Sequence, residues 1–242
     1  MTDIRNQDIG IVFVHGIVGN SHFFDFLMDA VPKGCKIISL TLEGHDGDAL
    51  AFSKASMRSW KRQVEEATDS LAKECKRIVI VAHSMGTLFA LDQGARNRAD
   101  ALFLLNPPMR IRLTRRLFLN PIKVMLGITT DPITMAARDA YGISLDYNPL
   151  HYYGWPRRYF ELFSEIKRVR KVIDNVRIKT RVFIAGRDEM VSPSSVDYFK
   201  PLKNCRLWQL PDSGHYYYTP SDRELILRQF SSLMADGIAE KG

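Results

Sequence analysis

The sequence predicts an α/β fold: a mostly parallel sheet of about six strands between two layers of helices, interrupted by a helical insert. Two observations lead to this prediction. Short apolar runs alternate with segments of helical periodicity along most of the 242-residue chain. Each run is apolar on both faces, as strands buried between helix layers require, and such alternation is typical of parallel sheets.

The expected strands are six short, β-branched runs, at 9–14, 36–40, 77–82, 101–105, 181–185 and 206–210. The expected helices, where apolar residues recur at helical spacing, include 23–31, 57–75, 88–95 and 222–234. Ser221 and Glu224 predict a capping box at the start of the last helix.

The alternation lapses between residues 107 and 176. This stretch has no clear strand, and four prolines interrupt it: Pro121, Pro132, Pro149 and Pro156. We expect three or four short helices that form a cap. The predicted division is a core of residues 1–106 and 177–242 with an insert at 107–176. The insert is not expected to be independent, because strands adjoin both of its ends.

The composition is that of an ordinary globular protein, with 45% hydrophobic and 25% charged residues. The three cysteines are too few and too scattered for a disulfide framework. No apolar run reaches the ~18 residues that indicate a membrane span. These observations predict a soluble, cytoplasmic protein.

Positive charge is concentrated in the predicted insert. The range 107–181 holds 15 Lys and Arg against six Asp and Glu, whereas the net charge of the whole chain is +7. This excess either attracts an anionic substrate or surface, or is a solvated basic face. Nucleic acid is not an expected partner, because the sequence shows neither a reading helix nor an aromatic RNA-binding platform.

A serine follows the third expected strand and opens a helix. The segment Ala82-His83-Ser84-Met85-Gly86 matches the G-x-S-x-G nucleophile turn in that context, with alanine in place of the first glycine. Alanine adds only a methyl group, so the tight turn is retained. The pattern predicts Ser84 as a nucleophile. The alternative, a serine that merely caps the helix, leaves the later aspartate and histidine unexplained.

Two further polar residues follow later strands. Asp188 comes after the fifth expected strand and His215 after the sixth. Because ligands bind at the carboxyl edge of parallel sheets, we expect both side chains to lie near Ser84, with Asp188 orienting His215 as the base. Glu189 is not expected to be the acid, and Asp212 is interpreted as a turn residue.

The loop after the first strand is the expected partner of the nucleophile turn. Acyl transfer places negative charge on a carbonyl oxygen, which backbone N–H groups must meet. The amides of Ile17 and Met85 are the predicted oxyanion-hole donors. Gly16 and Gly19 allow the loop to turn back, and we expect His15 to fix this loop rather than act as a base.

The insert is the expected source of substrate contacts. It is rich in apolar and aromatic side chains, and the candidates for lining a pocket are Met125, Tyr153 and Trp155. A small, partly apolar substrate is therefore expected. The range 157–173 is predicted to be a basic amphipathic helix with one apolar stripe: Phe160, Phe163, Ile166, Val169 and Ile173. Contact with a membrane surface is possible for such a helix, but inward packing is expected.

Five blocks together resemble the α/β-hydrolases, and most closely the monoacylglycerol lipase and carboxylesterase branch. The resemblance runs from about residue 9 to 234. It implies a three-layer α/β/α hydrolase fold, a Ser-His-Asp mechanism, no cofactor and a cap over the site. The insert itself matches no pattern that we can name. The blocks are His15-Gly16, Gly44-His45, 82–86, Gly186-Arg187-Asp188 and Gly214-His215.

The sequence therefore predicts a serine hydrolase that cleaves carboxylic esters through an acyl-enzyme. Other acyl or carbon–carbon hydrolases, such as thioesterases, amidases or diketone hydrolases, stay open, as does a non-catalytic ligand-binding relative. A haloalkane or epoxide hydrolase would require aspartate at position 84, so Ser84 argues against both. No metal is expected, because metal-ligand spacing is missing, and the sequence has no phosphate-binding glycine motif for a nucleotide cofactor.

Overall fold

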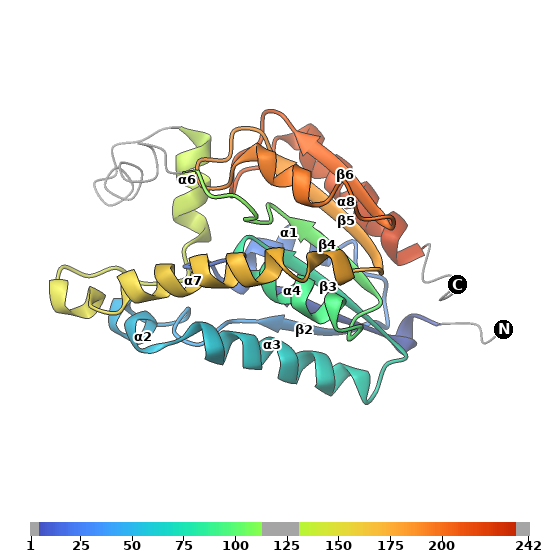
Figure 1. The fold of residues 1–242 in the computed structure, drawn as a ribbon, viewed down its shortest axis with the longest axis horizontal. Coiled ribbons are helices and arrows are strands. Elements are labelled where there is room, and N and C mark those ends of the chain that lie inside the picture. Colours follow the sequence, from blue (N-terminus) through green and yellow to red (C-terminus); the bar gives the residue numbers. More distant parts are fainter. Residues whose placement is uncertain (1–4, 113–130, 236–242) are drawn as a thin grey trace.

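The computed structural model describes residues 5–112 and 131–235 and contains a six-stranded sheet. Every pairing is parallel, in the order β2-β1-β3-β4-β5-β6 (Figure 1). This confirms the predicted parallel sheet, and each strand begins and ends within two residues of its expected bounds. The strands are β1 (Ile9–Val14), β2 (Lys36–Leu40), β3 (Arg77–His83), β4 (Ala101–Leu105), β5 (Lys179–Ala185) and β6 (Cys205–Leu210).

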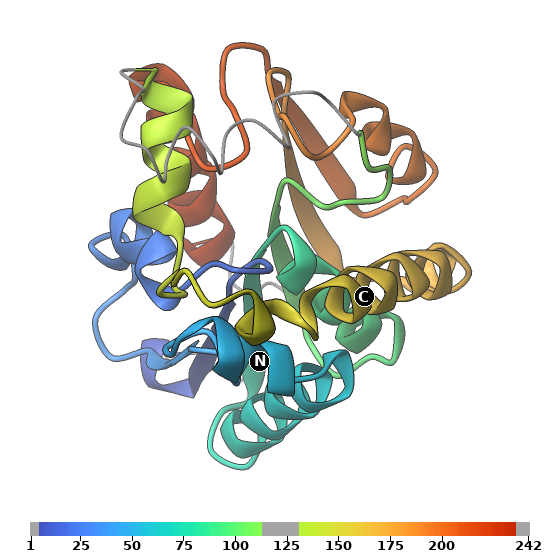
Figure 2. The same ribbon diagram turned by 90° about the vertical axis from the view of Figure 1, so that its left-hand side faces the viewer.

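Helices cover both faces of the sheet (Figure 2). On one face lie α3 (Met57–Ala72), α4 (Met85–Ala95) and α7 (Trp155–Arg170), and on the other lie α1 (Asp25–Met28) and α8 (Pro220–Ala235). This arrangement confirms the three-layer α/β/α fold. The remaining helical segments are η1 (Asn6–Asp8), η2 (Ser21–Phe24), α2 (Ala49–Lys54), α6 (Pro132–Ala140), η3 (Pro149–Tyr152), η4 (Ile173–Asn175) and η5 (Pro193–Tyr198).

The sheet has an apolar core on each face, and successive side chains of a buried strand point alternately into one core and the other. In β1, Val12 and Val14 pack in the core beneath α3, α4 and α7. Ile9, Ile11 and Phe13 pack in the opposite core with α1 and α8. Because successive strand side chains point to opposite faces, a strand between two helix layers must be apolar at every position. The unbroken apolar runs of the sequence have this cause.

The start of α8 corrects the predicted capping box. The helix begins at Pro220, and the hydroxyl of Thr219 accepts the amide N–H of Asp222. Ser221 therefore lies inside the helix and is not its cap. Proline suits the first helical position, because its φ is already helical and its missing N–H would have no helical partner there.

The insert contains one long helix rather than short helices alone. Four helical segments lie between β4 and β5 in the described chain, and α7 among them has 16 residues. The predicted apolar stripe is wrong in its first half: Ile166 and Val169 are buried, but Phe160 is 69% exposed. Residues three apart fall about 60° short of a full helical turn, so the stripe drifts around the helix. The division into core and insert stays a prediction.

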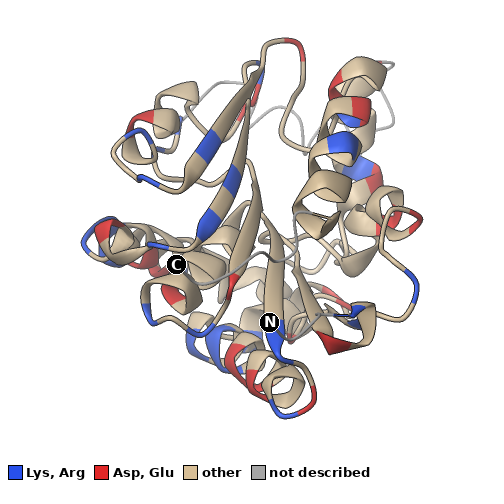
Figure 3. Ribbon diagram, turned by 90° about the vertical axis from the view of Figure 1, so that its right-hand side faces the viewer, with Lys and Arg blue, Asp and Glu red and all other residues tan. Residues whose placement is uncertain are grey.

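Ion pairs on two buried carboxylates join α7 to the core. Arg168 contacts Asp92 of α4 and Glu165 of its own helix, each at 2.7 Å. Lys61 of α3 lies 3.7 Å from Asp92 and 3.6 Å from Glu165. Basic and acidic residues lie close together on these helices (Figure 3). Part of the positive charge of the insert is therefore balanced inside the molecule. Among the described residues, no helix has the length and apolar character to cross a bilayer.

Helix α4 passes very close to β1 at Gly86. A Cβ atom on this glycine would lie 2.3 Å from the carbonyl oxygen of Val14 and 2.7 Å from that of His15. Both obstacles are backbone atoms of a central strand and its loop, which cannot turn aside as a side chain can. Gly86 is thus required for the sharp strand-to-helix turn that the sequence predicts.

We expect Gly86→Ala to lower the free energy of unfolding by about 2 kcal/mol or more, because the added methyl group forces strand and helix apart. Gly94→Ala is the matched control in the same helix. Its methyl group would meet the flexible end of Leu102 at 2.9 Å, and alanine favours a helix by about 1 kcal/mol over glycine. Urea denaturation measures both, and equal losses would contradict this interpretation.

Candidate active site

Ser84 lies on the turn between β3 and α4, with φ 50° and ψ −123°. Side chains rarely adopt this left-handed region, and such a conformation costs about 1–3 kcal/mol. The turn is supported from the neighbouring strand, because the amide of Ser84 donates to the carbonyl of Leu105 at 2.9 Å. The strained backbone carries the hydroxyl to the carboxyl end of the sheet.

The three predicted residues meet at this edge. The Oγ of Ser84 lies 2.9 Å from Nε2 of His215, and Nδ1 of His215 lies 2.6 Å from Oδ2 of Asp188. All three are buried, with Ser84 only 4% exposed. Serine, imidazole and carboxylate thus form a continuous hydrogen-bonded chain from β3, β5 and β6, with the geometry needed to move a proton from the hydroxyl to the ring.

The Asp188 carboxylate is fixed by its own loop. Its Oδ1 accepts the amide N–H groups of Met190 at 2.8 Å and Val191 at 2.6 Å, which leaves Oδ2 for His215. The guanidinium of Arg112 donates to the Asp188 carbonyl at 2.8 Å. Because both oxygens have defined partners, the carboxylate cannot rotate without losing hydrogen bonds.

Two residues that the sequence did not single out for this role hold the His215 backbone. His83 Nε2 donates to the carbonyl of His215 at 3.0 Å, and Asn106 Nδ2 donates to the same oxygen at 2.9 Å. The Oδ1 of Asn106 accepts the amide of Ala185 at 2.9 Å. Asn106 follows β4 directly, so the sequence did indicate that this residue lies at the carboxyl edge of the sheet, near the other candidate residues.

Burial and neighbouring charge separate the two site histidines. Burial lowers the pKa of His215, but the charge and hydrogen bond of Asp188 and the charge of Glu189 raise it, and the net pKa is raised. Burial and the charge of His215 hold the pKa of His83 well below its usual range. His215 is therefore the ring that can take a proton, while His83 stays neutral as a donor.

The loop after β1 lies against Ser84. A Cβ atom on Gly16 would be 2.8 Å from the Cβ of Ser84, so glycine permits this approach. His15 fixes the loop: its Nε2 accepts the amide of Leu42 at 3.0 Å and its Nδ1 lies 2.8 Å from the Gly16 carbonyl. Within residues 5–112 and 131–235, the buried Ile17 and Met85 amides donate no hydrogen bond to the protein.

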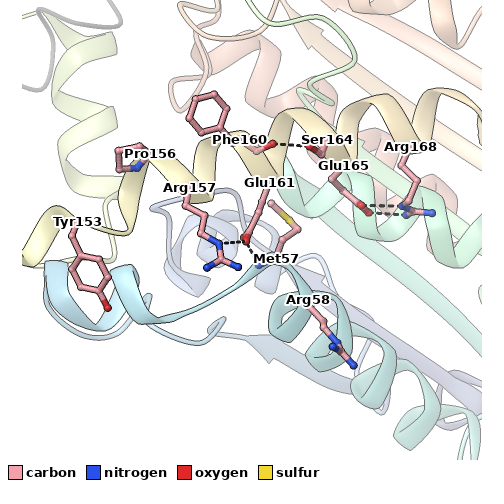
Figure 4. Close-up of a pocket in the computed structure, with 10 residues that line it drawn as sticks. All are labelled: Met57, Arg58, Tyr153, Pro156, Arg157, Phe160, Glu161, Ser164, Glu165 and Arg168. Carbon is pink, nitrogen blue, oxygen red and sulfur yellow. Dashed lines mark hydrogen bonds and ion pairs between the residues drawn. The ribbon is translucent and has the colours of Figure 1, made fainter.

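Two of the three candidate substrate residues of the insert, Tyr153 and Trp155, lie within the described structure. Met125 is outside the described residues. Trp155 donates its indole N–H to the Ala49 carbonyl at 3.0 Å and packs on Phe52. Tyr153 is 65% exposed. It lines a groove of about 690 Å³ between α7 and α3 together with Met57, Arg58, Pro156, Arg157, Phe160, Glu161, Ser164, Glu165 and Arg168 (Figure 4).

No metal-binding group of three or more His, Cys, Asp or Glu side chains occurs in the described part of the chain. The lining of the groove includes none of Ser84, Asp188 and His215. A substrate role for Met125, Tyr153 and Trp155 stays a prediction.

Known proteins share this fold and parts of the sequence. A thermostable monoacylglycerol lipase from Bacillus sp. (strain H-257) is 28% identical over 88 residues, 36% of this chain and 35% of the lipase. A structure from work on LipS and LipT, two metagenome-derived lipolytic enzymes, has a TM-score of 0.71 at 15% identity, covering 95% of this chain and 94% of that one. A putative ancestral haloalkane dehalogenase has a TM-score of 0.64 at 17% identity, with 96% and 93% covered.

The fold defines the class of protein, a three-layer α/β/α protein built on a parallel sheet. The family is shown by a match to the model of the alpha/beta hydrolase family over residues 11–228. The chain belongs to the alpha/beta hydrolase family. The chain spans about a third of the length of the curated lipase that it matches, and the distant structural likenesses show the fold alone.

Two buried histidines lie beneath the loop after β1. The rings of His15 and His45 are 4.8 Å apart, and His45 also packs against Phe52 and Trp60. His45 Nδ1 lies 3.2 Å from the Glu43 carbonyl, while its Nε2 is buried without a partner in the described structure. Burial lowers the pKa of His15 to about 4, and burial with the charge of His15 lowers that of His45 to about 3.

We expect the free energy of unfolding to fall as the pH drops from about 6.5 towards 4. The unfolded chain binds protons at both histidines in this window, whereas the folded chain does not. His45→Phe keeps an aromatic ring among aromatic neighbours and should reduce the slope by about 1.4 kcal/mol per pH unit, the contribution of one proton. Urea denaturation between pH 7 and pH 4.5 measures it. An unchanged slope would show that His45 is not held neutral.

Proposed function

We propose that this hydrolase is a serine hydrolase that cleaves carboxylic esters through an acyl-enzyme. The observation that carries the proposal is the hydrogen-bonded chain from Ser84 through His215 to Asp188, at 2.9 and 2.6 Å. A serine hydroxyl is a weak nucleophile until a base removes its proton, and an imidazole oriented by a carboxylate is such a base.

The geometry suggests a role for each group. His215 takes the proton of Ser84 as Oγ attacks the ester carbonyl, and Asp188 stabilises the imidazolium that forms. The amides of Ile17 and Met85, which have no acceptor among the described residues, receive the negative charge on the carbonyl oxygen. His215 then gives the proton to the departing alcohol, and a water molecule activated by the same ring hydrolyses the acyl-enzyme.

Dehalogenation fits the site less well than ester hydrolysis, whereas cleavage of other acyl or carbon–carbon bonds fits it equally well. A haloalkane dehalogenase displaces halide with a carboxylate, and Ser84 occupies the nucleophile position here. Thioesters, amides and diketones suit the same three groups, so they are the alternatives within the enzyme class. The lipolytic names of two similar proteins favour esters. A non-catalytic binder would not need a serine, a histidine and an aspartate joined by hydrogen bonds.

The proposal extends to the substrate and its setting. We propose a small, partly apolar ester, cleaved without a metal or cofactor in the cytoplasm. The free state of Cys35, Cys75 and Cys205 supports a reducing compartment. Nucleic acid and membranes are not proposed partners, since charges such as that of Arg168 are balanced internally and much of α7 packs inward.

We expect a fluorophosphonate probe to label the protein at Ser84 alone. Ser84→Ala and His215→Ala should abolish labelling, and Asp188→Asn should slow it by about 10⁴-fold because the amide favours the wrong tautomer of the ring and lacks the charge that stabilises the imidazolium. Ser164→Ala, which removes an exposed hydroxyl on α7, is the control and should label normally. Gel fluorescence and peptide mass spectrometry provide the readout. Folded protein that does not label would favour the non-catalytic binder.

We expect p-nitrophenyl esters to be hydrolysed with kcat/KM that rises with acyl length at first, because each buried methylene contributes about 0.8 kcal/mol. The measurement is initial rates for acetate to laurate esters, with Ser84→Ala as the blank. Equivalent thioesters and anilides, measured alongside, test the alternatives. Faster turnover of a thioester or an anilide than of its matched ester would replace the ester assignment.

A further inference from the structure

Glu189 is a second buried carboxylate beside His215, and the proposed mechanism gives it no part. Its side chain is only 6% exposed, and Oε2 lies 3.3 Å from the backbone nitrogen of His215. The same oxygen would be 3.5 Å from a Cβ atom on Gly214. Consecutive residues thus approach one histidine from two directions: Asp188 contacts the ring nitrogen, and Glu189 accepts from the main chain.

The groups around Glu189 come from several elements. Asp188 precedes it, His215 and Tyr216 lie on the loop after β6, and Tyr141 follows α6. Burial and the charge of Asp188 raise the pKa of Glu189 and outweigh the charge and backbone amide of His215, which lower it. In the other direction, the charge of Glu189 is among the causes that raise the pKa of His215. The ring of His83 also packs against that of His215, and because the pKa of His83 is held well below its usual range, this ring is neutral and adds no charge beside His215.

Burying a carboxylate is unfavourable unless nearby groups stabilise its negative charge. Removing a carboxylate from water costs several kcal/mol, and a neutral side chain of the same size would avoid that cost. Asp212, three residues before His215, is a nearby carboxylate in a different setting: it is mostly exposed and pairs with Arg187 at 2.9 Å. Glu189 is buried, and among its contacts is the backbone amide of His215.

We propose that Glu189 is a positioning residue for His215, which holds the Gly214–His215 backbone and adds a negative charge that stabilises the imidazolium formed when Ser84 gives up its proton. The inference rests on the proposed function for the proton transfer itself. Substitutions at Glu189 can separate the effect of its contact with the backbone from the effect of its charge. Glutamine keeps an oxygen for the amide of His215 and removes the charge, whereas alanine removes both.

Two variants and one control test the inference. In Glu189→Gln the pKa of His215, followed by NMR of histidine-labelled protein, should fall by on the order of half a pH unit or more. The acidic limb of kcat/KM should move to lower pH by the same amount, with kcat reduced about threefold or more and KM unchanged. Glu189→Ala should lose more in kcat. Asp212→Asn, which removes a nearby exposed charge, should change neither quantity.

The readouts keep two failures apart. The NMR titration needs no turnover, and His215→Asn assigns its resonance among the six histidines. If the protein hydrolyses no ester and takes no fluorophosphonate, the proposed function fails, while the titration still tests Glu189. An unchanged His215 titration in Glu189→Gln would overturn the inference. Should Glu189→Ala fail to fold, the near-isosteric glutamine variant decides the question.

Discussion

The turn between β3 and α4 constrains everything else at this edge of the sheet. Ser84 has a positive φ there, and the two strands beside β3, which are β1 and β4, must accommodate it together with α4. Gly86 lets α4 pass over the end of β1, Gly16 lets the loop after β1 reach the serine, and the carbonyl of Leu105 at the end of β4 accepts the serine amide. Ser84 is held by backbone contacts, which are less adaptable than side-chain packing.

Differences in surroundings give similar side chains different properties. Four buried histidines lie within this part of the molecule. His15, His45 and His83 have lowered pKa values because burial dominates, whereas the carboxylates beside His215 raise its pKa. The neutral rings serve as hydrogen-bonding and packing groups. Only the ring with acidic neighbours is prepared to hold a positive charge, and this contrast distinguishes a base from structural histidines.

The features that could be predicted from sequence are those set by local pattern. A strand buried on both faces is apolar throughout, so all six strands were predicted, and parallel strands bring their carboxyl ends together, so Ser84, Asp188 and His215 were expected to meet. Hydrogen bonds between distant segments leave no such pattern. The contacts of Asn106 and His83 with the His215 carbonyl span more than a hundred residues.

Two predictions about the helices were wrong because the sequence pattern alone did not determine them. The apolar stripe of α7 was drawn with a three-residue step, and which side of the helix is buried depends on partners such as Asp92 in α4. The cap of α8 depended on whether Pro220 or Asp222 began the helix, which the spacing of serine and glutamate did not settle. Tertiary contacts decided the buried side of α7, as they commonly do for surface helices, whereas the start of α8 is set locally by Pro220 and the Thr219 hydroxyl.

The most direct measurement is a crystal structure of the protein after reaction with a small fluorophosphonate. We expect the phosphorus atom bonded to Oγ of Ser84, the phosphoryl oxygen within hydrogen-bonding distance of the Ile17 and Met85 amides, and His215 still paired with Asp188. An unmodified Ser84, or an adduct whose oxygen points away from both amides, would contradict the arrangement described for this site.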